Sequence, residues 1–437
     1  MLLVACTLAI MAATSTLPSD APPQAPRPQY PSEEALRRYA QGRLLEERGQ
    51  RDLALGEYSR ALLLDDGAAS LARRLSETSA IAGEPARSLE FAERALRIDP
   101  DDARALWLQG TALLNLNRER EALAPLEAAA KGDSEKVEYL RTLGRAAESL
   151  DRLDIAVRSY RRVVWLDPDD VESWFQLAAG EARLGHFGAA DTALAEVAEM
   201  NPLRPGVFFL QGWVQENLGH PQRAMDLYQE HLKIHPDDQV TRRRAVNLLA
   251  REKRFDEAWR EVRVIARARP DDRETGEVEA DLAFSAGRAA AGAQALQRLR
   301  RRWPDDPEVL AISVGVLARH DRAGQAVGEA EAWTAKRPDD FRAHLVAARA
   351  RTLNREPDAA LVHLRRAMVL APDSLAPRAM LARFYDQQRR NDEAEKIWAE
   401  TAQRFPGHNG VAFDLAACRE KLGDLAGAEA AVRDVLR

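Results

Sequence analysis

The sequence predicts an all-α protein, built as a solenoid of about twelve helix-turn-helix repeats of 34 residues. Each 34-residue interval carries two amphipathic helical patterns, and a composition with only 6% aromatic residues favours helix throughout. A regular proline marks the period. A fixed period of this size predicts one stacked array rather than several globular domains. The prolines in register are Pro100, Pro168, Pro202, Pro236, Pro270, Pro304, Pro338, Pro372 and Pro406.

An apolar leader and a proline-rich spacer precede the repeats. Residues 1–17 resemble the apolar core of a secretory signal, although a positively charged start is missing. Cys6 also stands in a sequence similar to a lipoprotein box, so a cleaved signal, a lipidated anchor and an uncleaved anchor all remain open. Prolines make residues 18–34 a stiff, extended linker. We expect an exported protein of the periplasm or envelope, with a cytoplasmic protein as the alternative.

The repeats themselves occupy residues 35–437. In the repeat at 137–170, apolar or small residues follow helical spacing first around Leu143 and then around Tyr160. We therefore expect helices at about positions 2–14 and 18–30 of each repeat, joined by a turn that often carries glycine at position 15. With the proline as position 32, eleven full repeats begin at residues 35, 69, 103, 137, 171, 205, 239, 273, 307, 341 and 375, and a partial one at 409.

This pattern resembles the tetratricopeptide repeat. That family has large residues at positions 4 and 7, small residues at 8 and 20, an aromatic residue at 24 and proline at 32. The resemblance implies a right-handed α-solenoid whose first helices line a concave groove for peptides. Matching residues include Trp174, Leu177, Ala178 and Ala190 in the fifth repeat, and Phe208, Gly212, Ala224 and Tyr228 in the sixth.

The sequence offers little for catalysis, metals or cofactors. No phosphate loop, nucleophile elbow or zinc-protease motif occurs, and two cysteines cannot build a disulfide framework or a zinc site. His231 and His235 are four residues apart, but packing or surface histidines explain them better than a metal site. We expect no enzyme, no cofactor and, at a net charge of −6, no nucleic-acid partner. The acid pairs at 101–102, 169–170, 271–272 and 339–340 are expected to cap helices.

The predicted binding surface is the outward side of the first helices, formed by positions 2, 5, 9, 12 and 13. Aromatic residues beside arginines are typical of interface hot spots. Arg243 and Asn247 match part of the clamp with which some family members hold chaperone C-termini, but Val278 and Glu308 break the rest of that pattern. The predicted partner-binding residues are Trp107, Arg141, Arg145, Phe175, Phe209, Trp213, Arg243, Asn247, Arg349 and Arg383.

We therefore predict a non-catalytic scaffold that binds protein segments in a concave groove, in envelope complex assembly or polysaccharide secretion. Two alternatives stay open: the substrate-binding arm of a larger glycosyltransferase-like or sulfotransferase-like enzyme, and a cytoplasmic adaptor. The apolar Val432, Val435 and Leu436 predict further chain, a partner or self-association at that end. Glycines at positions 4 and 20 of the eighth repeat, Gly276 and Gly292, predict local looseness there.

Overall fold

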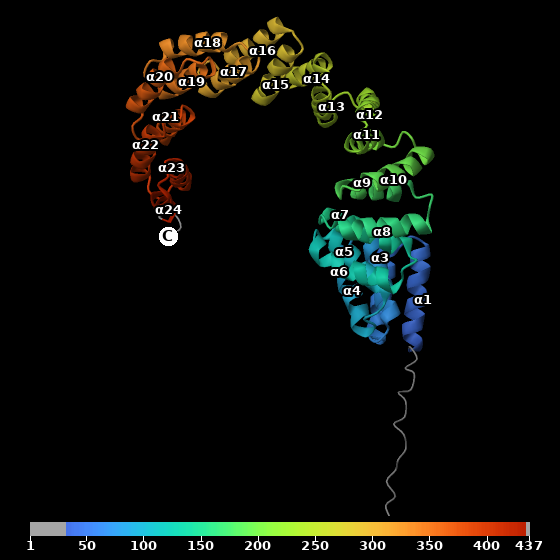
Figure 1. Ribbon diagram of the computed structural model, residues 1–437. Coiled ribbons are helices and arrows are strands. Elements are labelled where there is room, and N and C mark those ends of the chain that lie inside the picture. The colour runs from blue at the N-terminus through green and yellow to red at the C-terminus, as the bar shows by residue number, and fades with distance from the viewer. Residues whose placement is uncertain (1–31, 434–437) are drawn as a thin grey trace, which may run out of the picture. The chain divides into compact units, whose positions relative to one another are not determined.

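The structure is a computed structural model, and it describes residues 32–433. Within that range the regular structure is entirely helical, and 24 helices follow one another in sequential pairs (Figure 1). The predicted all-α solenoid of helix-turn-helix repeats is confirmed. The chain divides into two compact units, Met1–Leu203 and Arg204–Arg437. The predictions for residues 1–17, for nearly all of the linker, and for Val435 and Leu436 fall outside the described residues.

The first unit contains ten of the described helices, and every odd-numbered helix opens a repeat. Their bounds are α1 Glu33–Glu47, α2 Arg51–Leu64, α3 Ala69–Ile81, α4 Pro85–Ile98, α5 Ala103–Asn115, α6 Glu119–Gly132, α7 Val137–Ser149, α8 Leu153–Leu166, α9 Val171–Arg183 and α10 Phe187–Met200.

The second unit contains the remaining fourteen. Their bounds are α11 Val207–Asn217, α12 Pro221–Ile234, α13 Gln239–Arg251, α14 Phe255–Ala268, α15 Arg273–Ser285, α16 Ala289–Arg302, α17 Pro307–Arg319, α18 Ala323–Lys336, α19 Phe341–Leu353, α20 Pro357–Leu370, α21 Leu375–Gln387, α22 Asn391–Arg404, α23 Asn409–Lys421 and α24 Leu425–Arg433. Helix α11 starts late because Pro205 and Gly206, with φ +86°, precede it.

Within each unit, each helix packs against the next one along the chain. First helices of neighbouring repeats also touch, as in α3 with α5, α15 with α17 and α19 with α21. First helices therefore lie side by side from α3 to α7 in the first unit and from α15 to α21 in the second. None of the helices between residues 32 and 433 has the length and apolar character that crossing a membrane requires.

Small residues at position 8 let the two helices of a repeat approach closely. A Cβ atom added at these glycines would lie 2.5, 2.8 and 2.6 Å from the ring of a fully buried tyrosine at position 24. The hydroxyl of each tyrosine then donates to a glutamate at position 12 of the same repeat. The glycine–tyrosine pairs are Gly42–Tyr58, Gly144–Tyr160 and Gly212–Tyr228.

Position 15 has a left-handed backbone in each of the twelve repeats, whether or not glycine is present. Glycine adopts positive φ without steric penalty, whereas other residues pay a small conformational cost there. Glycine fills the position at Gly49, Gly83, Gly185, Gly219, Gly287 and Gly423, and other residues do so at Asn117, Asp151, Lys253, Asp321, Arg355 and Arg389.

The acid pairs cap the first helices, as predicted. The second aspartate of each pair accepts backbone N–H groups from the first turn of the helix that follows, which satisfies donors that have no partner inside the helix. These caps are Asp102, Asp170, Asp272 and Asp340.

The eighth repeat is better filled than its glycines suggest. A Cβ at Gly292 would lie 2.7 Å from the Phe284 ring, and one at Gly276 would lie 2.5 Å from a Leu299 methyl group. Neighbouring side chains thus lean into the space that glycine leaves. The Phe284 ring fills the space at Gly292. Local looseness or a bend in this repeat, measurable as faster amide exchange, stays a prediction. At Gly276 an open cavity remains on the other side.

Candidate functional site

The clearest pocket on the first-helix face lies in the second unit, between α19 and α21. It encloses about 510 Å³, within the range of about 300–1,000 Å³ that is typical of ligand pockets. Two predicted residues, Arg349 and Arg383, stand at position 9 of successive repeats and line it together. The remaining lining residues are Ala348, Thr352, Leu353, Leu364, Ala376, Ala379, Met380, Phe384 and Gln387.

Arg349 is the available cation of this pocket. Its side chain is exposed, and among residues 32–433 it has no ion pair. Gly315 occupies the equivalent position of the preceding repeat and has no side chain. A Cβ atom added to Gly315 would lie 3.8 Å from Nη2 of Arg349. Arg383 is 64% exposed in its side chain, and its Nη2 donates to Asp414 at 2.8 Å. The pocket therefore offers one unpaired guanidinium and one that is already half neutralised.

The floor of the pocket is apolar. Phe384 is buried beneath it, Met380 is half-buried, and Leu353 is exposed at its edge. A guanidinium above an apolar floor matches a protein segment that presents a carboxylate next to an apolar side chain. Arginine and aromatic or methionine side chains are also the residues enriched where protein interfaces form.

A second pocket on a first-helix face lies in the first unit, between α1 and α3, with a volume of about 380 Å³. Tyr39, Arg43 and Arg73 line it, and none of the three is among the predicted residues. The repeat pattern could have identified them, because these residues occupy positions 5 and 9, as the predicted residues do. Arg73 is not free, since its Nη1 donates to Asp102 at 2.6 Å.

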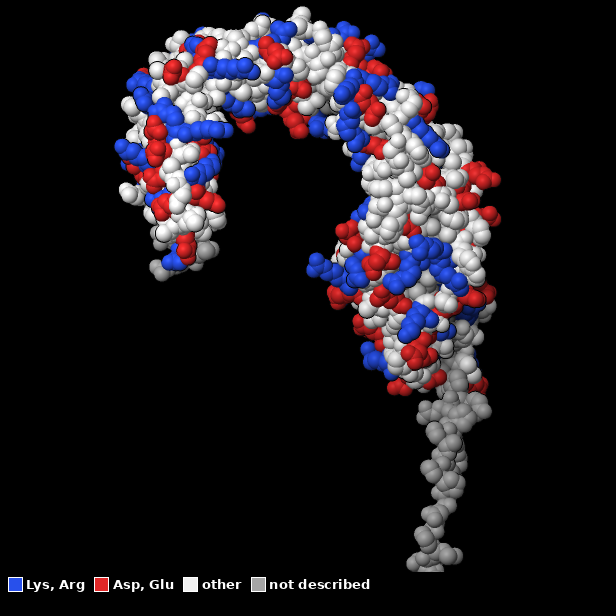
Figure 2. All heavy atoms as spheres, in the orientation of Figure 1, with Lys and Arg blue, Asp and Glu red and all other residues white. Residues whose placement is uncertain are grey.

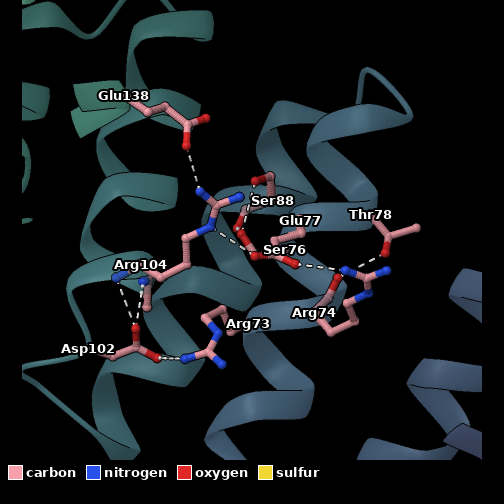
Figure 3. Close-up of polar contacts among 10 residues, drawn as sticks. Arg73, Arg74, Ser76, Glu77, Thr78, Ser88, Asp102, Arg104 and Glu138 are labelled. Carbon is pink, nitrogen blue, oxygen red and sulfur yellow. Dashed lines mark hydrogen bonds and ion pairs between the residues drawn. The ribbon is translucent and has the colours of Figure 1, made fainter. Parts of the chain in front are cut away.

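Ion pairs connect the first-helix face of the first unit from one repeat to the next (Figure 3). The Arg104 guanidinium on α5 lies between two carboxylates, with Nε 2.9 Å from Glu77 on α3 and Nη1 3.0 Å from Glu138 on α7. Arg74 also donates to Glu77, at 3.1 Å. Because opposite charges already meet here, this face is less suited to an acidic segment than the pocket at Arg349.

Two of the predicted arginines join neighbouring repeats by contacting a helix cap. Arg141 Nη2 lies 2.7 Å from Asp170, and Arg243 Nη2 lies 2.8 Å from Asp272, each the cap of the next repeat's first helix. Burial opposes ionisation of Asp170, but hydrogen bonds from Ser173 and Arg141 outweigh it and lower the pKa of that carboxyl. We therefore assign Arg141 and Arg243 an intramolecular role, as for Arg73.

The predicted aromatic residues are half-buried. Trp107 stacks on Tyr139 with ring centroids 5.7 Å apart, and its Nε1 donates to Thr142 of the next repeat at 3.1 Å. Trp107 is thus part of a junction between repeats, and its replacement by alanine would test stability rather than partner capture. Phe175 is half-buried on α9 in the same unit.

In the second unit, Phe209 packs with Tyr228 and His231 at centroid distances of 6.4 and 5.9 Å. The Arg244 guanidinium lies 5.3 Å from the ring centroid of Trp213. Two other predicted residues, Arg145 in the first unit and Asn247 in the second, are exposed. Contact of any of them with a partner stays a prediction.

Of the two histidines that are four residues apart, His231 is packed in the interior and His235 is exposed. His231 is buried, its Nε2 lies 3.0 Å from the Asp238 carboxylate, and its ring is 4.8 Å from that of His235. Across the described part of the chain, no group of three or more His, Cys, Asp or Glu side chains is placed to hold a metal ion. His231 thus supports the capping aspartate of α13.

The chain resembles several known proteins over part of their lengths. It is 28% identical over 198 residues to a tetratricopeptide repeat-containing protein, trd-1, of Caenorhabditis elegans, covering 43% of this chain and 26% of that protein. It is 30% identical over 151 residues to Superkiller complex protein 3 of Mus musculus, covering 32% of this chain and 9% of the relative. The matched regions therefore span well under half of these relatives.

Solved structures of similar proteins include YrrB, described as a TPR protein with an unusual peptide-binding site. It has 22% identity and a TM-score of 0.40, covering 42% of this chain and 95% of that one. Another is PilW, described as a type IV pilus biogenesis factor, with 18% identity and a TM-score of 0.36, covering 48% of this chain and 96% of that one.

Family models described as tetratricopeptide repeat match the sequence directly. One matches residues 39–103, 82–137, 175–239 and 379–437, together more than half of the chain, and a second matches residues 353–401. These matches agree with the paired helices and with the small and large residues that pack between them. The chain belongs to the tetratricopeptide repeat family and is a helical-repeat scaffold of the kind that serves protein–protein interaction.

Proposed function

We propose that this protein is a non-catalytic scaffold that holds a partner's peptide segment on the first-helix face of its second unit, between α19 and α21. The observation that carries the proposal is the pocket in which Arg349 and Arg383 stand over an apolar floor. The segment presents a carboxylate to Arg349 and an apolar side chain to Met380 and Phe384. An arginine–carboxylate contact of this kind contributes about 1.5–3 kcal/mol when it is well formed.

The proposed setting is an assembly of the cell envelope. The support for it is the apolar run at residues 1–17 followed by the proline-rich linker, which together resemble an export leader and a spacer. This localisation rests on the sequence alone. As an exported, non-catalytic scaffold, the protein would act in complex assembly or polysaccharide secretion.

Charge reversal at the pocket tests the binding proposal. Purified protein with Arg349→Glu is compared with the unmodified chain in pull-downs from fractionated cell extract, with mass spectrometry of the captured proteins. A matched control is Arg355→Glu, which makes the same charge change on an exposed residue in the turn that follows α19.

Proteins captured by the unmodified chain and by the Arg355→Glu variant, but lost with Arg349→Glu, are the expected partners. Envelope proteins among them would support the proposed setting. Identical capture by all three proteins would exclude the pocket as the binding site, and capture confined to cytosolic proteins would favour an adaptor role. A circular dichroism spectrum of each variant verifies that the helices are intact.

A further inference from the structure

A basic cavity lies on another face of the second unit, where the eighth repeat departs from its neighbours. It has a volume of about 450 Å³ and is formed between α14 and α16, beside the first turn of α15. Its walls come from the second helices α14 and α16, from the turn before α15 and from α15 itself. The lining residues are Arg263, Ala266, Arg267, Arg269, Pro270, Asp272, Gly276, Glu279, Ala295, Arg298, Leu299 and Arg302.

A pair of side chains that fills this space in three other repeats is missing here. In the first, seventh and tenth repeats, positions 4 and 23 carry polar side chains that join the two helices of the repeat. In the eighth repeat these positions are Gly276 and Ala295, and both line the cavity. The pairs that fill the equivalent space are Arg38–Glu57 in the first repeat, Arg242–Glu261 in the seventh and His344–His363 in the tenth.

The eighth repeat also lacks a contact between position 4 and the preceding proline. In the seventh and tenth repeats, Arg242 and His344 reach back to the carbonyl of the proline six residues earlier, at 2.7 and 2.9 Å. Gly276 has no side chain with which to reach Pro270, which instead lines the open space. The space that Arg242 and His344 fill in their repeats is therefore open in the eighth.

The charge of the walls determines what the guest must be. Five arginines and two carboxylates line the cavity, a net of three positive charges. Both carboxylates are occupied: Glu279 accepts from Arg298 at 2.7 Å through each oxygen, and Asp272 accepts from Arg243 at 2.8 Å. The charges that remain available are cationic.

Two of these cations are uncommitted. Arg267 and Arg269 are exposed, and neither has an ion pair within residues 32–433. Helix α16 carries four arginines and no acidic residue, but Arg298, Arg300 and Arg302 already pair with Glu279, Glu329 and Asp271. Basic side chains are exposed over this part of the second unit, with acidic ones among them (Figure 2).

We propose that this cavity is a second docking site, which binds a glutamate or aspartate side chain from an acidic protein segment. The carboxylate would meet Arg267 and Arg269, while its methylene groups would lie against Leu299, Ala295 and Ala266. The apolar walls favour a carboxylate carried on a hydrocarbon stem over a free inorganic anion. This site has no residue in common with the pocket at Arg349, so the two binding proposals can be tested independently.

The test uses the full chain and a fluorescein-labelled peptide of six glutamates, followed by fluorescence anisotropy at low ionic strength. A peptide of six glutamines is the uncharged comparison. The Arg267→Ala/Arg269→Ala variant should bind the acidic peptide at least about tenfold more weakly, because each arginine–carboxylate hydrogen bond is strong. Arg301→Ala is the matched control, since Arg301 is exposed on α16, has no ion pair among the described residues and does not line the cavity.

A second variant tests occupancy of the space. Ala295→Glu places a carboxylate inside the cavity, as in the seventh repeat, and should block the peptide while circular dichroism shows intact helices. Equal weakening by Arg301→Ala, or equal binding of the glutamine peptide, would overturn the proposal. Binding that is lost in Arg349→Glu but kept in Arg267→Ala/Arg269→Ala would also overturn it, while supporting the first-helix pocket.

The remaining sources of negative charge are separated in the same assay. Binding of inorganic phosphate that depends on Arg267 and Arg269, without binding of the glutamate peptide, would identify a free-anion site and refute a peptide site. Co-sedimentation with phosphatidylglycerol vesicles that depends on Arg267 and Arg269, without binding of the glutamate peptide, would assign the cavity to a membrane surface instead.

Discussion

Replacing Gly212 by alanine should destabilise the second unit, although alanine is the better helix former. Gly212 is buried on α11, and an added Cβ would lie 2.6 Å from two ring carbons of Tyr228. The ring cannot retreat without disturbing its hydroxyl, which donates to Glu216 at 2.7 Å. Helix propensity contributes about 1 kcal/mol in favour of alanine, while overpacking costs about 1–3 kcal/mol and a weakened hydrogen bond about 1 kcal/mol. We expect a net loss of about 1–3 kcal/mol.

The matched control is Gly328→Ala on α18 in the same unit. Gly328 is exposed, and an added Cβ would meet nothing within 4 Å, so the propensity gain of about 1 kcal/mol should appear as increased stability. Urea unfolding followed by circular dichroism gives the midpoints of both variants and of the unmodified chain. Repeat arrays need not unfold in two states, so the order of the midpoints is the measured quantity. If Gly212→Ala raised the midpoint as much as Gly328→Ala, close packing at position 8 would be refuted.

Three further predictions concern single groups. Burial opposes ionisation of Asp272, but hydrogen bonds from Thr275 and Arg243 lower the pKa of that carboxyl below its ordinary 3.8. Its contribution to stability is therefore complete above about pH 4 and is lost as the pH falls further. The Asp272→Asn variant should show a smaller fall of the urea midpoint on the acid side of a pH profile. Tyr228→Phe should cost about 1 kcal/mol in urea unfolding, and no measurable loss would show that its bond to Glu216 adds nothing. Burial raises the pKa of the Cys418 thiol, so in a Cys6→Ser variant Ellman's reagent should react slowly until guanidinium unfolds the chain; immediate reaction in buffer would contradict the burial.

The fold could be predicted from the sequence because its rules are local and repeated. The spacing of prolines fixes the period, and the small residues at position 8 with aromatic residues at 24 fix how each helix pair packs. The structure shows both, down to the contact between Gly144 and Tyr160. Even the capping aspartates followed from their place at a helix start.

The site was harder to predict, because exposure depends on what the next repeat supplies. Arg141 and Arg349 both stand on the predicted face, but Arg141 is at position 5 and reaches the cap of the following helix. Arg349 is at position 9, where it meets Gly315 on one side and an open pocket on the other. Trp107 is a residue type typical of interface hot spots, but it already contacts Thr142 and Tyr139 of the next repeat.

The arginine at position 5 gives the array a direction. Arg73, Arg141 and Arg243 each complete the cap of the repeat that follows them, and the cap never depends on this arginine of a later repeat. During synthesis, which proceeds from the N-terminus, a newly emerged first helix thus finds its guanidinium on a repeat that has already been made. Removing repeats from the C-terminal side leaves the earlier caps complete. Removing a repeat that carries this arginine from the N-terminal side leaves the capping aspartate of the next repeat without its guanidinium.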